Sequence, residues 1–402
     1  MTAGNSDEFL IAGGGLGGLA TALALSVQGI PSRVLEQSSE SREIGAGIHL
    51  GPNVFRTCEQ LGIMEQMTAK AVFVDHLEMR DALSGDEITR VQVKGACLER
   101  YGYPYAIHHR ADMLDVFLKA CQDSPQITLE TSRRVVRIED DGNGVSVETE
   151  DGSSYRGRAL IGADGLWSKV RAYLFGDEMP RVSGHIAYRA VLPMNEVPEE
   201  LKQNAAIIWV GPRNHLIHYP LRDWELFNVV AVFHSDKYVE GWNEPGDRDE
   251  LLTRFADVGT LPMILLERVS DWRMWVLCDR EPTDVWSRGR VTLIGDAAHP
   301  MLQYFAQGAS MAIEDGLCVA GKIRDADDDL ESAFEAYQQE RYLRTGRVQL
   351  MARFLGDVYH AEGVKRDLRN RMLGARTQAK ALEGLDWLYR GPQTDSGPAR
   401  YS

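Results

Sequence analysis

The sequence predicts an α/β fold in which a parallel sheet with flanking helices carries an inserted antiparallel sheet and ends in a helical C-terminal region. Three observations predict it. A strand–helix–strand pattern occupies the N-terminal part, apolar and polar residues alternate in two middle segments, and apolar residues return at helical spacing near the C-terminus. The length of 402 residues exceeds what one ordinary hydrophobic core supports, so we expect two lobes or one domain with a large insertion.

The N-terminal elements begin with the apolar run at 9–12, which predicts a short buried strand. Residues 19–28 are rich in Ala and Leu and predict a closely packed helix, and residues 32–36 predict a second strand. A strand–helix–strand unit of this length forms a right-handed parallel pair.

The middle of the chain has a different pattern. At 72–93 and again at 182–276, apolar and aromatic residues alternate at short intervals with turn residues, which indicates an antiparallel sheet. Residues 290–295 return to the buried-strand pattern, and helices are predicted over 309–323 and 330–358. The antiparallel segments therefore form an insertion between parts of the parallel sheet.

Composition limits the classes of partner. The formal net charge of -15 argues against nucleic acid and against an anionic membrane, so an anionic ligand needs a local basic pocket. The five cysteines include no C-x-x-C pair, and their odd number predicts neither a disulfide framework nor a metal site. No signal peptide or membrane span is expected, and the protein is predicted to be cytoplasmic.

A glycine-rich turn follows the first predicted strand. Gly13, Gly15 and Gly18 form the pattern G-x-G-x-x-G before the predicted helix, and Glu36 ends the next strand. The first glycine allows the tight turn, the second lets the backbone approach a pyrophosphate, and the third lets helix and strand pack closely. The helix N-terminus attracts phosphate, and Glu36 is expected to accept hydrogen bonds from a ribose. This context predicts a dinucleotide site without deciding between FAD and NAD.

Two further motifs follow predicted buried strands. Asp164 precedes Gly165 after the run at 159–163, and Asp296 stands in G-D-A-A-H-P at 295–300. Taken alone, each aspartate is also typical of a turn or a helix cap. Their joint occurrence downstream of the glycine-rich turn favours a shared flavin site. The predicted helix start at 308–309 would stabilise the negative charge of a reduced flavin through its dipole.

The three motifs, in this order and at similar spacing, resemble those of the group A aromatic hydroxylases, the para-hydroxybenzoate and salicylate hydroxylase type, over nearly the whole chain. The resemblance implies bound FAD, NADH or NADPH as a transient reductant, O2 as a co-substrate, and a homodimer. By the same resemblance, Asp296 contacts the ribityl chain, Asp164 lies near FAD and the approach of the nicotinamide, and Arg110 contacts FAD. The cofactor-binding residues expected from motifs and resemblance together are Gly13, Gly15, Leu16, Gly18, Glu36, Gly47, Arg110, Asp164, Asp296, Gly308 and Ala309.

Two segments carry a closer resemblance within this family. Residues 211–221 and 295–304 resemble the members that hydroxylate 3-hydroxybenzoate to gentisate. The substrate-lining residues implied by this likeness are His215, Tyr219 and Gln303, with Tyr105 as a further candidate. Because side chains of a strand alternate, His215 and Tyr219 share one face, whereas His218 falls on the other and is expected to be structural.

The implied reaction is hydroxylation of a phenolic acid para to its hydroxyl group. NADH or NADPH reduces FAD, O2 adds to the reduced flavin as a hydroperoxide, and its distal oxygen attacks an electron-rich ring carbon. A phenolate activates the ring more than a phenol, so His215 is the expected base, with Gln303 orienting the same oxygen. Tyr219, or Tyr105, is expected to hydrogen-bond the carboxylate, and water must be excluded.

Three alternatives stay open. The same chemistry is compatible with salicylate or a hydroxynicotinate as substrate. A flavoprotein reductase or dehydrogenase would turn over without incorporating labelled oxygen, and a non-catalytic flavin sensor would show no NADH oxidation stimulated by aromatic compounds. The site residues also have structural interpretations: His215 as a core histidine, Gln303 as a loop residue and Tyr219 as an edge-strand residue before proline.

The predicted domain organisation follows from these assignments. A Rossmann-like FAD-binding domain, an inserted substrate domain and a helical C-terminal region share the chain. Their predicted segments are 1–71, 101–180 and 286–345 for the FAD-binding domain, 72–100 and 181–285 for the substrate domain, and 346–402 for the C-terminal region.

Overall fold

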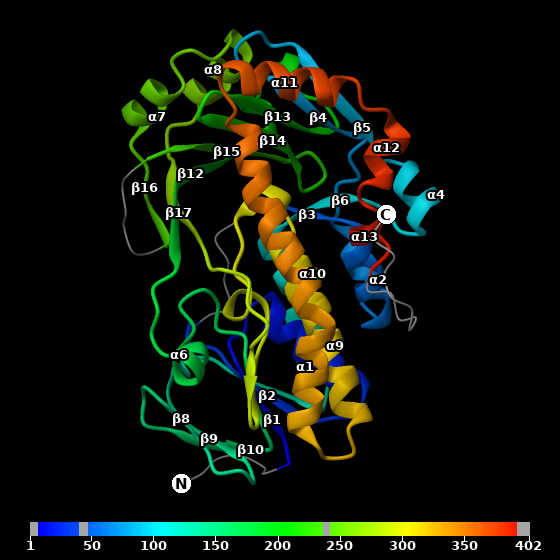
Figure 1. The fold of residues 1–402 in the computed structure, drawn as a ribbon, viewed down its shortest axis with the longest axis vertical. Coiled ribbons are helices and arrows are strands. Elements are labelled where there is room, and N and C mark those ends of the chain that lie inside the picture. Colours follow the sequence, from blue (N-terminus) through cyan, green and yellow to red (C-terminus); the bar gives the residue numbers. More distant parts are fainter. Residues whose placement is uncertain (1–6, 40–46, 236–241, 392–402) are drawn as a thin grey trace.

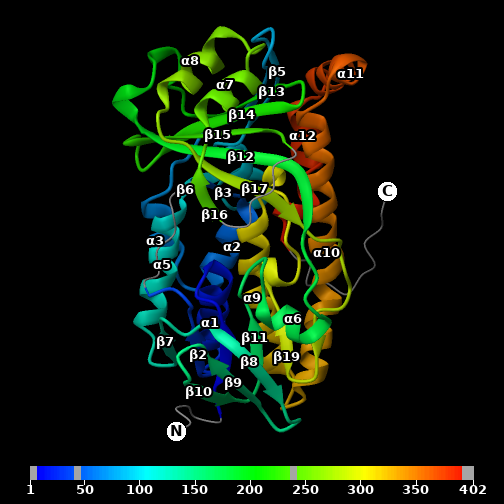
Figure 2. The same cartoon turned by 90° about the vertical axis from the view of Figure 1, so that its left-hand side faces the viewer.

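The structure is a computed structural model, and it describes residues 7–39, 47–235 and 242–391. Two lobes lie along its longest axis (Figure 1). The lower lobe holds the N-terminal strands, the upper lobe holds the large sheet, and one long helix runs beside both. Figure 2 shows the same arrangement from the side, with the long helix along one flank.

A mainly parallel sheet forms the centre of the lower lobe. Among the described residues its order is β18-β19-β11-β1-β2-β7, and only β18 and β19 pair antiparallel. The central strands are apolar and buried, as expected for a parallel sheet that helices cover. The strands are β1 (Phe9–Ala12), β2 (Ser32–Leu35), β7 (Ile127–Glu130), β11 (Leu160–Gly162), β18 (Ser287–Arg288) and β19 (Val291–Leu293).

Helix α1 (Leu16–Val27) joins β1 to β2 and packs against α9 (Gly308–Asp325). Small residues allow the close approach, since a Cβ added at Gly316 would lie 2.8 Å from the Thr21 backbone N. The helix was predicted over 19–28 and in fact begins at Leu16, because the glycines of the turn form its first residues. The predicted strand–helix–strand unit is confirmed.

The upper lobe is built on a large sheet, with the order β16-β17-β12-β15-β14-β13-β4-β5 among the described residues. Most neighbours are antiparallel, as predicted, but β13 and β4 pair in parallel. The chain returns to the lower lobe between β5 and β12, so no hairpin sets the relative direction of β4 and β13. The strands are β4 (His76–Asp81), β5 (Glu87–Gln92), β12 (Arg181–Pro193), β13 (Ala205–Gly211), β14 (Asn214–Leu221), β15 (Leu226–His234), β16 (Trp242–Pro245) and β17 (Arg273–Asp279).

The two faces of this sheet have different partners. Helices α7 (Arg248–Arg254) and α8 (Thr260–Arg268) cover one face, where Phe233 and Phe255 are buried in a hydrophobic cluster. Alternation along β15 places Val230 on the opposite face. That opposite face is turned toward the lower lobe (Figure 2).

Smaller elements complete the fold. Strands β3 (Gly47–Leu50) and β6 (Ala106–His109) pair antiparallel, and a small antiparallel sheet lies at the lower end. That sheet contains β8 (Val135–Asp140), β9 (Val145–Thr149) and β10 (Ser154–Gly157). The other helices are α2 (Pro52–Gln60), α3 (Met64–Ala69), α4 (Ala96–Tyr101), α5 (Arg110–Gln122), α6 (Lys169–Phe175), α11 (Gly363–Gly374), α12 (Gln378–Glu383) and α13 (Asp386–Tyr389), with short 3-10 helices η1 (Met194–Glu196), η2 (Glu199–Leu201), η3 (Gly295–Ala297) and η4 (Gln303–Phe305).

The predicted helical C-terminal region is confirmed as far as residue 391, and its residues 392–402 lie outside the described residues. The domain boundaries assigned from the sequence stay a prediction. None of the described helices combines the length and the apolar character needed to cross a membrane.

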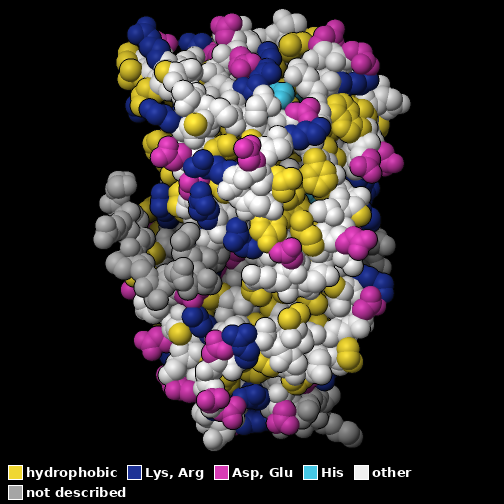
Figure 3. All heavy atoms as spheres, turned by 90° about the vertical axis from the view of Figure 1, so that its right-hand side faces the viewer, with side chains coloured by type: hydrophobic (Ala, Val, Ile, Leu, Met, Phe, Trp, Pro, Cys, Tyr) yellow, Lys and Arg dark blue, Asp and Glu magenta, His cyan; other side chains and the backbone are white. Residues whose placement is uncertain are grey.

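Charged side chains of both signs are interspersed on the face shown in Figure 3, and hydrophobic side chains gather in its upper half. This face therefore has no single sign of charge, although the whole chain has a net charge of -15. An anionic ligand would depend on local charges inside a site rather than on attraction to this face.

Helix α10 (Leu330–Tyr359) runs along both lobes and is fixed to α9 by buried ion pairs. Arg341 donates to Asp315 Oδ1 at 2.7 Å and to Glu314 Oε2 at 2.6 Å, and Arg344 Nε donates to Glu314 Oε2 at 2.8 Å. Burial alone would raise the pKa of both carboxyl groups, but the neighbouring cations outweigh it. The pKa of each carboxyl group is consequently lowered to about 2.

Asp315 also holds the loop that follows β19. Its Oδ2 accepts a hydrogen bond from the Gly295 backbone N at 3.0 Å and lies 2.5 Å from His299 Nε2. All three residues are buried. The conformation of the predicted third motif is therefore set by a carboxylate on α9 that also binds α10.

The pH dependence of stability tests this network. Both pKa values are lowered from 4.5 and 3.8, so the stabilisation is complete above about pH 4.5 and is lost as the pH falls toward 2. We expect Arg341→Met, which removes the arginine from Asp315 and leaves Glu314 with Arg344 alone, to lower the free energy of unfolding at pH 7 by about 3–5 kcal/mol. As the pH falls from 7 toward 2, the free energy of unfolding of the Arg341→Met protein should decrease less than that of the wild type. Urea denaturation at each pH measures both.

The matched control is Arg324→Met, which removes an exposed pair with Asp325. This control should unfold like the wild type at every pH. An Arg341→Met protein as stable as the control would contradict the role assigned to the network.

Candidate active site

A cavity of about 1160 Å³ lies between the two lobes. The glycine-rich turn and the loop before α9 line it from the lower lobe. One face of the large sheet lines it from the upper lobe, and residues of α10, α11 and the last helices close the remaining side. Most sequence-predicted site residues meet in this single space, which therefore is the candidate active site.

The predicted glycine-rich turn forms one end of the cavity. Gly13 has a φ of +108°, and a Cβ added there would lie 2.4 Å from Ala163 O. A Cβ on Gly18 would lie 1.9 Å from Gly13 O. Gly15 has open space around it and lines the cavity together with Leu16, at the N-terminus of α1. Gly13 and Gly18 thus allow close packing, and the space beside Gly15 suits a pyrophosphate.

Glu36 lies beside this turn, directly after β2, and does not line the cavity. Its Oε2 accepts a hydrogen bond from Gly14 N at 2.6 Å, and its Oε1 accepts one from Ser38 N at 2.8 Å. Two backbone donors therefore hold the carboxylate near the turn. Its contact with a ribose stays a prediction.

Asp164 caps helix α6. Its Oδ2 accepts from Lys169 N at 2.7 Å and from Val170 N at 3.1 Å, and its Oδ1 accepts from the Ser168 hydroxyl. Burial raises the pKa of Asp164 although these hydrogen bonds oppose the shift. The neighbours Ala163 and Gly165 line the cavity, and Asp164 does not. The capping interpretation has direct evidence, and the predicted contact with FAD stays a prediction.

Asp296 projects into the cavity from η3. Its carboxylate makes no hydrogen bond to the described residues, and an added Cβ on Gly308 would lie 3.9 Å from Asp296 Oδ1. Asp296 is exposed where it lines the cavity, and desolvation by the surrounding residues raises its pKa, with His299 and Arg110 opposing the shift. Arg110, at the start of α5, lines the same space.

These residues fit a flavin nucleotide. An unpartnered carboxylate at Asp296 can accept a hydrogen bond from a ribityl hydroxyl group. Gly308 and Ala309 line the cavity at the N-terminus of α9, whose dipole favours a negative charge there. The glycine-lined turn at Gly15 leaves room for phosphates at the other end.

The predicted substrate residues lie on the opposite wall of the cavity. His215, Ile217 and Tyr219 all line it from β14, as the alternation of the strand predicts. Gln303 lines it from η4. His218 lies on the other face of the sheet, where it accepts a hydrogen bond from Trp209 Nε1 at 3.0 Å. The structure thus brings the predicted residues together.

Each of the aromatic candidates already has a protein partner. The Tyr105 hydroxyl lies 2.7 Å from His49 Nδ1, and the Tyr219 hydroxyl donates to Gly47 O at 3.1 Å. A Cβ on Gly47 would lie 2.1 Å from Tyr219 Cε2, so this position requires glycine. Gly47 lines the cavity and packs against Tyr219, and its predicted contact with the cofactor stays a prediction.

His215 is a buried, neutral imidazole. Its Nδ1 lies 2.7 Å from His360 Nε2, at the end of α10, and its Nε2 makes no hydrogen bond to the described residues. Burial, with a contribution from His185, lowers the pKa of His215 to about 3. The ring is therefore uncharged near neutral pH and can accept a hydrogen bond from a ligand.

Arg189 is the main functional candidate that the sequence interpretation missed. It lines the cavity from β12, donates to Gln303 Oε1, and lies over the Trp275 ring at 5.0 Å from its centre. Its Nε has no hydrogen-bond partner among the described residues. Burial, with a smaller effect of Arg110, lowers the pKa of Arg189 to about 10, so the side chain stays charged at neutral pH.

A signal for Arg189 exists in the sequence. It interrupts the apolar alternation of residues 185–192, where a charged residue on an inward face is unusual. His49 was also missed. It lines the cavity, its Nε2 has no hydrogen-bond partner among the described residues, and burial lowers its pKa to about 4.

Comparisons of the sequence and of the structure with known proteins both find FAD-binding proteins. Residues 7–350 match a family model described as an FAD binding domain. The chain is 45% identical over 381 residues to a 3-hydroxybenzoate 6-hydroxylase of Polaromonas naphthalenivorans (strain CJ2), covering 94% of this chain and 95% of that protein. It is 42% identical over 380 residues to a 3-hydroxybenzoate 6-hydroxylase of Klebsiella oxytoca, covering 94% and 96%. Klebsiella pneumoniae HpxO complexed with FAD and uric acid has a TM-score of 0.85 and 26% identity, covering 96% of this chain and 97% of that chain.

Asp296→Asn tests the flavin end of the cavity. Loss of a charged hydrogen-bond acceptor should weaken FAD binding about 10- to 100-fold, since such a bond contributes about 1.5–3 kcal/mol. The measurement is the dissociation constant from quenching of flavin fluorescence. The exposed Asp284→Asn protein is the control and should bind FAD like the wild type. Equal affinities of the two variants would remove Asp296 from the cofactor site.

Proposed function

Because this chain belongs to the family of FAD-binding monooxygenases, we propose that it hydroxylates 3-hydroxybenzoate to 2,5-dihydroxybenzoate (gentisate), with NADH or NADPH and O2. The predicted family and its FAD requirement are confirmed, and the particular substrate is our proposal. The observation that carries it is the Arg189 guanidinium, which faces the same cavity as His215 and forms no ion pair among the described residues.

Arg189 is the proposed binding partner of the substrate carboxylate. A guanidinium inside a protein is costly when no anion compensates it. Among the described residues, the partners of Arg189 are the neutral Gln303 and the Trp275 ring, and none of them accepts a hydrogen bond from its Nε. An aromatic carboxylate supplies the missing anion and accepts two parallel hydrogen bonds from the guanidinium. Tyr219 and Tyr105 stay predicted contacts, although both hydroxyls already have protein partners.

His215 and Gln303 are the proposed hydrogen-bond partners of the phenolic hydroxyl. Gln303 Oε1 is occupied by Arg189, so its amide NH2 group remains to donate to the substrate oxygen. Among the described residues, Nε2 of the neutral His215 has no partner, so it can accept a hydrogen bond from the phenolic hydroxyl while Nδ1 contacts His360. This hydrogen bond draws the hydroxyl toward the phenolate form, which activates the ring more than the phenol does.

The flavin end completes the reaction. FAD held by Asp296, Gly15 and the N-terminus of α9 would supply reduction by NADH or NADPH and transfer of one oxygen atom of O2 to the ring, with the other oxygen atom leaving as water. Phenolate formation at His215 makes the carbon para to the hydroxyl electron-rich, and this carbon lies next to the carboxylate-bearing carbon of 3-hydroxybenzoate. Apolar side chains such as Ile217 and Leu277 line the same space and exclude water.

The decisive experiment mixes the purified, FAD-loaded protein with NADH and a panel of hydroxybenzoates and a hydroxynicotinate. Oxygen uptake, incorporation of labelled O2 and the product isomer are measured together. We expect coupled turnover with 3-hydroxybenzoate and labelled 2,5-dihydroxybenzoate as product. Preference for salicylate or a hydroxynicotinate would overturn the substrate assignment, and turnover without label would support a reductase.

Two variants separate the proposed roles. Arg189→Gln should raise the KM for 3-hydroxybenzoate about 10- to 100-fold, since it removes a charged hydrogen bond to the carboxylate. His215→Ala should still bind FAD and substrate but release hydrogen peroxide in place of gentisate. Steady-state kinetics with peroxide detection distinguishes the two. Unchanged coupled turnover in His215→Ala would remove His215 from the mechanism, and an unchanged KM in Arg189→Gln would remove Arg189.

We also infer a homodimer that is formed through α10. Leu343, Leu350 and Phe354 share one side of this helix and are 61%, 54% and 59% exposed. A row of exposed apolar side chains marks a protein contact surface, and a second copy of this chain presents the same row. Light scattering should find a dimer that Leu350→Asp converts to a monomer. The control Val27→Asp, at an exposed site on α1, should stay dimeric, and a monomeric wild type would contradict the inference.

A further inference from the structure

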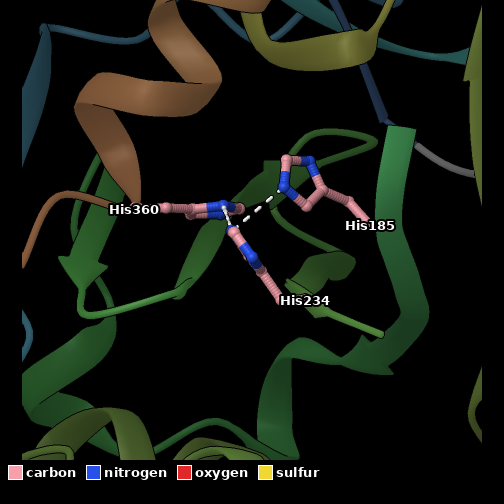
Figure 4. Close-up of side chains that lie close together, drawn as sticks. All are labelled: His185, His234 and His360. Atoms are coloured by element: carbon pink, nitrogen blue, oxygen red, sulfur yellow. Dashed lines mark hydrogen bonds between the residues drawn. The ribbon is translucent and has the colours of Figure 1, made fainter. Parts of the chain in front are cut away.

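Three histidines converge outside the cavity wall (Figure 4). His185 lies on β12, His234 ends β15, and His360 follows α10. Hydrogen bonds join His234 to each of the other two rings, and one nitrogen of each ring lies within 4.8 Å of the other two. His185 and His234 are half-buried and His360 is buried, so the group lies at the boundary between solvent and the interior.

The fold dictates this convergence. His185 and His234 are direct partners in the antiparallel pairing of β12 and β15, so their side chains share one face. The turn before β14 brings in the third ring, because Arg213 N donates to His360 O at 3.1 Å and Arg213 O accepts from His234 N at 3.1 Å. Arg213 has a φ of +59°, a left-handed conformation that lets the turn make both contacts.

Hydrogen bonds alone do not satisfy the three rings. His234 Nε2 lies 3.0 Å from His185 Nε2 and 3.1 Å from His360 Nδ1. A neutral imidazole nitrogen has either one N–H or one lone pair, so His234 Nε2 serves two partners with a single group. Three nitrogens around a tetrahedral zinc ion lie about 3.3 Å apart, given Zn–N bonds of 2.0–2.1 Å. Two of the three separations are close to this value, and the third lies within 4.8 Å.

We propose that His185 Nε2, His234 Nε2 and His360 Nδ1 bind one divalent first-row transition-metal ion. Imidazole ligands suit Zn²⁺, Ni²⁺ and Cu²⁺, and a set of three leaves a position for water. The remaining ring nitrogens have supporting contacts, since His185 Nδ1 lies 2.6 Å from the Tyr304 hydroxyl and His360 Nε2 lies 2.7 Å from His215 Nδ1. Such outer contacts fix the orientation of metal-binding histidines.

The metal would act on His215 through His360. With Nδ1 on the metal, His360 carries its proton on Nε2 and donates it to His215 Nδ1. His215 then carries its own proton on Nε2 and no longer accepts one from a phenol. This consequence rests on the proposed function, and it makes the bound ion an inhibitor of hydroxylation. The binding itself does not depend on that function.

The test uses the untagged, FAD-loaded protein after dialysis against a chelator. Zn²⁺ is titrated in competition with a chromogenic chelator, and the retained metal is measured by mass spectrometry after gel filtration. We expect one Zn²⁺ per chain in the wild type. Substituting one of the three ligands, in His234→Gln or His185→Gln, should weaken binding at least about 100-fold, since even outer contacts of a metal ligand contribute 10- to 100-fold.

The matched control is His76→Gln, a partly buried histidine on β4 that pairs with Glu78 away from the cluster. It should retain Zn²⁺ like the wild type. A wild type that retains no Zn²⁺ overturns the proposal, and this result does not depend on the folding of any variant. Wild-type affinity in a well-folded His234→Gln protein overturns it as well, whereas loss of hydroxylation alone bears only on the proposed function.

Discussion

The buried carboxylate of Asp315 joins the loop after β19 to both α9 and α10. It accepts hydrogen bonds from Gly295 N and His299 Nε2, and it pairs with Arg341. These contacts fix the loop that turns Asp296 into the cavity and fasten α10 to α9. A buried charge that loses its partner destabilises a protein by about 3–5 kcal/mol, so this arrangement tolerates little change. The flavin end of the cavity is thus positioned by electrostatics as much as by packing.

Helix α10 connects the ion pair of Asp315 with residues of the other lobe. It contains 30 residues, which corresponds to about 45 Å of helix. Its middle holds Arg341 against α9, and the residue that follows its last turn, His360, contacts His215. One continuous element therefore positions both the loop at the flavin end and the imidazole at the substrate end. The same helix end completes the histidine cluster, which places the proposed metal site one contact away from the proposed base.

Local sequence patterns predicted most of the fold and part of the site. The glycine-rich turn and the face shared by His215 and Tyr219 follow from short-range geometry, and both were predicted correctly. The parallel pairing of β13 with β4 was not predicted, because it depends on strands from separate segments of the chain. The carboxylate of Asp164 caps α6, an interpretation that the sequence also allowed, and its contact with the cofactor, implied by resemblance, stays a prediction.

The histidine cluster illustrates the limit of sequence reasoning. His185 and His234 meet through strand register, and His360 reaches His215 across 145 positions of sequence. The three histidines do not follow a metal-binding spacing along the chain, so the sequence predicted no metal site. Arg189 is similar, since the lack of an anionic partner among the described residues becomes visible only when the surrounding residues are placed.

The most direct measurement of the central claim is a crystal structure of the FAD-loaded protein with 3-hydroxybenzoate. We expect the carboxylate against the Arg189 guanidinium, the hydroxyl between His215 and Gln303, and the carbon para to that hydroxyl turned toward the flavin. A ligand that binds in this cavity with its carboxylate away from Arg189 and its hydroxyl away from His215, or that binds elsewhere, would contradict it.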